Sequence, residues 1–99
     1  MDAAKVLTLA QSYAIAVHQE YPKADVYLFG SHASGTAHSD SDIDIAIVVN
    51  KVKGNWLDRS AQLWKLSQRF SNHIEPVLLE ADYDTNGFVC HVRKTGILL

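Results

Sequence analysis

The stretch that most restricts the fold is DIDIAIVVN, residues 42–50, which alternates acidic and branched apolar side chains at its start. Side chains alternate along a strand, so Asp42 and Asp44 point to one face. The opposite face, turned toward the core, carries Ile43, Ile45 and Ile47. Their Cα atoms lie about 6 to 7 Å apart at strand rise. Two carboxylates this close repel one another, so a compensating positive charge is expected beside them.

The neighbouring sequence does not supply that charge. No Lys or Arg lies between Lys23 and Lys51. The same window holds four aspartates, Asp25, Asp40, Asp42 and Asp44. A divalent cation supplies the missing charge most simply, and carboxylate oxygens suit Mg²⁺. Two alternatives stay open: both aspartates are solvated on an open sheet face, or they pair with a basic residue distant in the sequence.

The pattern of the remaining chain predicts alternating helices and strands. Glycine, proline and small polar residues separate the predicted elements. The predicted helices cover residues 2–20, 54–72 and 82–96, the predicted strands cover 24–30, 42–50, 73–80 and 97–99, and a turn or short helical loop covers 30–41. This order predicts an α/β or α+β fold in which helices pack on a small mixed sheet.

Polar side chains mark where the predicted helices begin. Asp2 and Asn55 stand where a side-chain oxygen accepts a hydrogen bond from a free backbone N–H of the first turn. Asp84 or Thr85 is expected to do the same for the C-terminal helix. These caps predict three separate helix starts.

Apolar spacing and proline predict which surfaces are buried. The helix over 54–72 is expected to bury the side that carries Leu57, Trp64 and Phe70. Pro76 lacks an N–H and therefore predicts an edge or end position for the strand over 73–80. Cys90 is the only cysteine and is expected to be a small buried hydrophobe.

Length and composition set the broad class. The 99 residues predict one domain, 1–99, and the net charge of −2 gives no sign of direct nucleic-acid binding. No apolar run reaches the ~18 residues that a membrane helix needs, so no membrane contact is expected. A single cysteine favours the reducing cytoplasm over secretion.

The loop before the aspartates, GSHASG at residues 30–35, follows a predicted strand. Its glycines and Ser31 can aim backbone N–H groups at an anion, and a helix N-terminus there would favour phosphate. The alternative is an ordinary turn between a strand and a helix. A phosphate cradle beside a carboxylate pair is the combination that metal-bridged phosphate chemistry requires.

These residues carry a resemblance. FGSHASGTAHSDSDIDI, residues 29–45, resembles the signature of the DNA polymerase β-like nucleotidyltransferase superfamily. That signature is a hydrophobic residue, Gly, then Gly or Ser, about ten further residues, and Asp-hydrophobic-Asp-hydrophobic. Over the whole chain the sequence is similar to the minimal nucleotidyltransferase group, whose members are stand-alone catalytic cores.

The resemblance implies a reaction and residues to perform it. A nucleoside monophosphate, AMP if the substrate is ATP, passes from a nucleoside triphosphate to a hydroxyl acceptor with release of pyrophosphate. Asp42, Asp44 and a third carboxylate on a later strand hold two Mg²⁺ ions. Glu75 is the expected third carboxylate, as ligand or proton acceptor, and Glu80 is the second choice. The nucleotide-binding residues implied are Gly30, Ser31 and Ser41.

Two positions depart from the family pattern. Relatives often carry a basic or aromatic residue directly after Gly-Ser and an Arg before the second glycine, where this chain has His32 and Ser34. The change removes a cation that would contact the triphosphate. Two interpretations of Lys51 and Lys53, just after the predicted strand, stay open: ordinary solvated charges, or cations on the rim of the site that help to attract a nucleotide.

Partners also follow from the resemblance. Minimal nucleotidyltransferases are encoded beside small helical proteins of the HEPN type, and some act as antitoxins that attach adenylyl groups to that partner. The implied partners are a nucleoside triphosphate and a HEPN-type protein, and a homodimer is the other assembly expected. The alternative function is a catalytically weak nucleotide-binding or antitoxin module that acts by contact alone.

Overall fold

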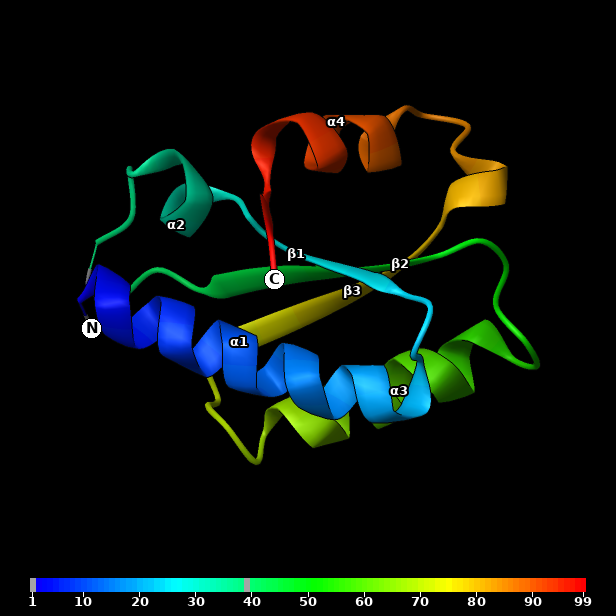
Figure 1. Cartoon of the computed structure of the whole chain (residues 1–99), viewed down its shortest axis with the longest axis horizontal. Helices are drawn as coiled ribbons and strands as arrows, with labels where there is room; N and C mark the ends of the chain where they lie inside the picture. The colour runs from blue at the N-terminus through cyan, green and yellow to red at the C-terminus, as the bar shows by residue number, and fades with distance from the viewer. Residues whose placement is uncertain (1, 39) are drawn as a thin grey trace.

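A mixed β-sheet organises the chain (Figure 1). The computed structural model describes residues 2–38 and 40–99, and within them the sheet has four strands in the order β3-β2-β1-β4. The strands are β1 (Asp25–Phe29), β2 (Ile43–Val49), β3 (Ile74–Glu80) and β4 (Ile97–Leu98). β1 pairs antiparallel with β2 and β4, whereas β2 and β3 are parallel. The small mixed sheet predicted from the sequence is confirmed.

Helices cover both faces of this sheet. The helices are α1 (Ala3–Glu20), α2 (Ser31–Ser34), α3 (Trp56–Ser67) and α4 (Phe88–Thr95), with a 3₁₀ turn, η1, at Ala81–Tyr83. Figure 1 shows α1 and α3 together on one face and α4 on the other. None of the helices within residues 2–38 and 40–99 combines the length and apolar character needed to cross a membrane.

The isoleucines of β2 form the centre of the larger core, as the alternating pattern predicts. Ile43, Ile45 and Ile47 are fully buried against α1 and α3. The opposite face of the sheet forms a smaller apolar cluster with α4. That smaller cluster is centred on Tyr27, Ala46, Val48, Val89 and Val92. β2 is thus buried along both faces except near its start, where Asp44 is only half-buried.

The predicted helix caps are present. The Asp2 carboxylate accepts from the Lys5 N–H at 2.8 Å, and the Asn55 side-chain oxygen accepts from the Asp58 N–H at 3.1 Å. At α4 the Asp84 carboxylate accepts from two first-turn N–H groups. Asp84 therefore performs the predicted capping rather than Thr85, although Gly87 occupies the N-cap position.

Two predictions about burial are wrong. α3 ends at Ser67 and buries Leu63 and Ser67, whereas Leu57 and Trp64 are 70% and 55% exposed. This helix has apolar residues on two sides, and the sheet covers only one of them. Cys90 is exposed because α4 buries the neighbouring valines and turns the thiol to solvent. The prediction that Pro76 lies on an edge strand is confirmed, since β3 is the outermost strand beside β2.

A buried hydrogen bond joins α1 to α3 and allows the packing to be tested. Tyr13 is fully buried, and its hydroxyl donates to the Leu63 carbonyl at 2.8 Å. Burial raises the pKa of Tyr13, so the hydroxyl stays a neutral donor. Tyr13→Phe should lower the free energy of unfolding by about 1–2 kcal/mol in urea titration, because it leaves a buried carbonyl short of a donor. Tyr83→Phe, at a 58% exposed position, should change nothing. Equal stability of both variants would show that the bond contributes nothing.

Candidate active site

The parallel pairing of β2 with β3 brings together carboxylates that are distant in the sequence. Asp44 is the direct register partner of Glu75, so the two side chains emerge side by side on one face. Asp42 lies immediately before β2, which begins at Ile43, so the prediction of two aspartates inside the strand is wrong by one residue. Asp42 nevertheless lies close enough to both of the other carboxylates to repel them.

The surroundings of Asp44 and Glu75 disfavour the ionised form of both carboxyls. Partial burial raises the pKa of Asp44, and repulsion from Asp42 raises it further, while His32 lowers it. Loss of solvent raises the pKa of Glu75 first, followed by repulsion from Asp42 and Asp44 and a hydrogen bond with Asp42. The cluster is therefore an excess of negative charge that a cation would relieve.

Distant basic residues do not compensate this charge in the part of the chain that the structure describes. The one ion pair there joins Arg93 to Asp25, away from the cluster. Pairing of Asp42 and Asp44 with a remote Lys or Arg, one alternative left by the sequence, is therefore not observed among these residues. Asp42 is exposed and Asp44 is half-buried, so water solvates only part of the negative charge of the pair.

Gly30 brings the loop backbone against the carboxylates. It has a φ of +73°, a conformation that residues with a Cβ rarely adopt. A Cβ built at Gly30 would also collide with the Asp44 side-chain oxygen Oδ2. Glycine is thus required twice here, by its dihedral angle and by the approach of Asp44. The Gly-Ser step that the sequence singled out lies directly beside the aspartates.

The serines and histidines of the loop mostly bond to one another. Ser31 is the first residue of α2. The Ser41 hydroxyl accepts from the His38 N–H at 2.9 Å, and its carbonyl oxygen lies 3.3 Å from His32 Nε2. The Ser34 hydroxyl shares a 2.8 Å hydrogen bond with Thr36. Ser41 therefore helps to shape the loop that precedes the aspartates.

Two of the predicted alternatives are not in this cluster. Glu80 lies at the far end of β3 and accepts from the Val52 N–H at 3.0 Å. Lys51 and Lys53 follow the far end of β2 and line a separate hollow, so the structure does not support the alternative that they stand on the rim of the carboxylate site. The strand carries them roughly 20 Å from Asp44.

Aromatic side chains that the sequence reasoning did not single out flank the cluster. Phe29 is the register partner of Asp44 on β1, and its ring packs edge-on against Phe88 of α4 at 5.7 Å between centroids. Phe88 in turn stacks with His91 at 6.4 Å. The position of Phe29 directly before Gly30 is the only sequence signal that could have placed its ring near the carboxylates. No local sequence pattern indicates that α4 packs against Phe29.

The donor set fits a hard divalent cation. Three carboxylates whose negative charges oppose one another provide the oxygen ligands that Mg²⁺ prefers. Across residues 2–38 and 40–99, no three acidic, His or Cys side chains already have metal-binding spacing, so these carboxylates would have to rotate to bind. Asp42 and Glu75 are both exposed and free to do so.

Comparison with known proteins identifies similar sequences. Residues 13–83, which include all three carboxylates and Gly30, match the family model of the nucleotidyltransferase domain. A 50-residue segment, 50% of the chain, is 40% identical to the protein adenylyltransferase MntA of Shewanella oneidensis, of which it covers 32%. The chain thus spans about a third of the length of that curated relative.

The fold as a whole also matches a solved structure. The crystal structure of a protein from Sulfolobus solfataricus that is assigned as a nucleotidyltransferase superposes with a TM-score of 0.68 at 29% sequence identity. The superposition covers 97% of this chain and 80% of that one. The helices and the mixed sheet therefore form a nucleotidyltransferase fold.

The contact between Gly30 and Asp44 predicts a difference between two glycine variants. Gly30→Ala should lower the free energy of unfolding by about 2 kcal/mol or more, because left-handed strain adds to the collision with Asp44. Gly35 has a similar φ of +79°, but no atom lies within 4 Å of the position that a Cβ would take there, so Gly35→Ala should lose only about 1 kcal/mol. Equal losses in urea titration would exclude a contribution from the collision.

Partial burial of Asp44 and its repulsion from Asp42 predict an unusual pH dependence of stability. A carboxyl whose pKa is raised in the folded state binds protons more tightly there, so its contribution to stability falls as the pH rises through the ordinary and then the raised pKa. Asp44→Asn should therefore be more stable than the original chain at pH 7 without divalent ions, with the difference shrinking below pH ~4. Thermal unfolding at both pH values measures this, with the exposed Asp82→Asn as control. A less stable Asp44→Asn at pH 7 would contradict the repulsion.

Proposed function

The chain belongs to the nucleotidyltransferase family, and from that premise we propose that it transfers AMP from ATP to a hydroxyl group of another molecule with release of pyrophosphate. The observation that carries the proposal is the convergence of Asp42, Asp44 and Glu75 beside the backbone of Gly30. This arrangement places carboxylate oxygens for cations directly beside the backbone of the loop that would bind phosphates. We place the reaction in the cytoplasm.

Asp42, Asp44 and Glu75 are assigned as the catalytic and metal-binding residues. Their mutual repulsion gives them a reason to bind divalent cations, and the raised pKa of Glu75 leaves it able to accept the proton of an acceptor hydroxyl. Two Mg²⁺ ions, when bound there, would neutralise phosphate charge and lower the pKa of the attacking hydroxyl. The carboxylates themselves would hold the reacting groups in line.

Gly30, Ser31 and Ser41 are assigned to nucleotide binding. The missing side chain at Gly30 lets the loop backbone lie against Asp44, so phosphate oxygens bound by this loop would lie next to the carboxylates. Ser31, half-buried at the start of α2, would donate a hydrogen bond to a phosphate. Ser41 would act by holding the loop, since its hydroxyl already accepts from His38. With Ser34 in place of the Arg of relatives, His32 is the side chain proposed to contact the phosphates, since it lies near enough to Asp44 to lower the pKa of that carboxyl.

The acceptor is proposed to be a protein. The relative from Shewanella oneidensis is a protein adenylyltransferase, which supports a protein hydroxyl over a free small molecule. We propose a small helical HEPN-type partner as the acceptor, with this chain as its antitoxin. Leu57 and Trp64, exposed on the outer side of α3, offer apolar surface for such a contact.

Transfer can be detected directly in a lysate of the source organism. The purified chain with Mg²⁺ and ATP labelled at the α-phosphate should label one protein acceptor on a gel. Asp44→Asn should reduce labelling at least about a hundredfold, since bound metal ions supply several kcal/mol of transition-state stabilisation. Omitting Mg²⁺ should have the same effect.

A matched pair of variants separates the site from the rest of β3. Glu75→Gln should lose most of the labelling, whereas Glu80→Gln, at the other end of the same strand, should retain it. Absence of label with ATP and with every other nucleoside triphosphate would refute transfer. If the Asp44→Asn variant still neutralised the toxic partner in cells, the chain would act by contact alone. Ser34 would favour that alternative, because it stands where relatives carry an arginine that contacts the triphosphate.

A further inference from the structure

A second charged region lies on the other side of the sheet from the carboxylates. A hollow of about 1130 Å³ opens between the turn joining α1 to β1, the loop joining β2 to α3, and one side of α3. Six of the nine Lys and Arg residues of the chain line it, namely Lys23, Lys51, Lys53, Arg59, Lys65 and Arg69. We call this region the basic hollow.

The basic hollow is separate from the carboxylate cluster in two respects. Val49 lines it at the end of β2, five residues and roughly 16 Å along the strand from Asp44. Val49 also packs with the core on the α1 and α3 side, whereas Asp44 shares the face that α4 covers. A ligand in the basic hollow would therefore not reach the carboxylates.

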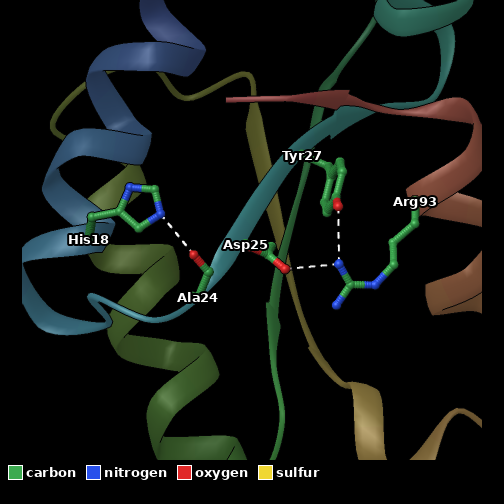
Figure 2. A network of polar contacts seen from close by, with 5 residues as sticks. All are labelled: His18, Ala24, Asp25, Tyr27 and Arg93. Carbon is green, nitrogen blue, oxygen red and sulfur yellow. Dashed lines mark hydrogen bonds and ion pairs between the residues drawn. The ribbon is translucent and has the colours of Figure 1, made fainter.

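Few acidic groups offset these cations. Glu20 is the one carboxylate in the lining that the structure describes. Asp25, near the same turn, points to the other face of the sheet, where it pairs with Arg93 at 2.8 Å (Figure 2). Glu80 is engaged with the Val52 N–H. The hollow thus keeps a local positive excess in a chain whose net charge is −2.

Hydrogen bonds fix two of its walls. His18 Nε2 and the Ala24 carbonyl oxygen lie 2.9 Å apart, which ties the end of α1 to the start of β1 (Figure 2). On the opposite wall Arg59 Nε donates to the Lys53 carbonyl at 3.1 Å, so the half-buried guanidinium holds the loop at the mouth of the hollow. The site is therefore partly formed before any ligand arrives.

The cations are spread over a distance larger than one phosphate group. Arg59 lies in the first turn of α3 and Arg69 just past its end, so about 15 Å of helix length separates them. Lys and Arg side chains bind phosphate oxygens through charge-assisted hydrogen bonds, and the volume is sufficient for a nucleotide-sized ligand. We propose that the basic hollow binds a compact anion bearing several phosphate groups, at a site distinct from the catalytic one.

The lining favours a compact ligand over a nucleic-acid strand. Single nucleic-acid strands bind to proteins through exposed aromatic side chains, on which the bases stack, as well as through cationic side chains. Tyr21 is the one aromatic residue of the lining within the described residues, and its ring is half-buried against the core. The overall negative charge also disfavours a long polyanion.

Calorimetric titration with inorganic tripolyphosphate, in EDTA so that no divalent ion is present, tests the proposal. The original chain should bind it, and Lys65→Gln with Arg69→Gln should weaken binding about tenfold through loss of two charge-assisted hydrogen bonds. The control, Lys5→Gln with Lys94→Gln, removes the same charge from exposed positions outside the hollow and should bind as the original chain does. Circular dichroism melting checks that both double variants fold.

Two further measurements locate the binding site and identify the class of ligand. Tripolyphosphate should shift the amide NMR signals of residues 51–54 and 62–69 while leaving those of Gly30 and Asp44 unmoved. A single-stranded oligonucleotide should bind more weakly than tripolyphosphate. Equal affinity of the two double variants for tripolyphosphate, or NMR shifts confined to the Gly30 loop, would overturn the proposal that the basic hollow is the binding site. Tighter, hollow-dependent binding of the oligonucleotide would overturn the compact ligand and reassign the hollow to nucleic acid.

Discussion

The parallel pairing of β2 with β3 determines both the core and the candidate active site. In this register Ile43 lies beside Ile74 in the core, and Asp44 lies beside Glu75 at the surface. A slip of one residue would turn Glu75 into the core and Ile74 into solvent. Packing energy therefore holds two repelling carboxylates side by side, because separating them would expose the apolar side chains of the same strands.

The features that could be predicted from the sequence are those determined by local interactions. The alternation in residues 42–50 predicted that Ile43, Ile45 and Ile47 share the face turned toward the larger core. Asp2 and Asn55 are placed by the free N–H groups of a helix start. The position of Glu75 needed more than local pattern. It followed from a resemblance that supplied a third carboxylate on a later strand, and the structure places it next to Asp44.

The features that could not be predicted depend on tertiary contacts. α3 has apolar side chains on two sides, and only the position of the sheet decides that Leu63 is buried and Trp64 exposed. Cys90 is exposed for the same kind of reason, since α4 packs through its valines. Lys51 follows the aspartates closely in the sequence, yet an extended strand carries it to another part of the molecule. The basic hollow collects side chains from three segments and has no signature in any one of them.

Pro76 has a consequence for how the molecule meets copies of itself. It lies within β3, the outer strand of the sheet, opposite Ile45 of β2. An outer strand normally offers a row of free N–H and C=O groups to which a strand of another chain can add, and a proline interrupts that row. Extension of the sheet across two molecules at this edge is therefore disfavoured. A dimer that extends the sheet would have to use the other outer strand, β4, whereas the β3 edge is protected against aggregation.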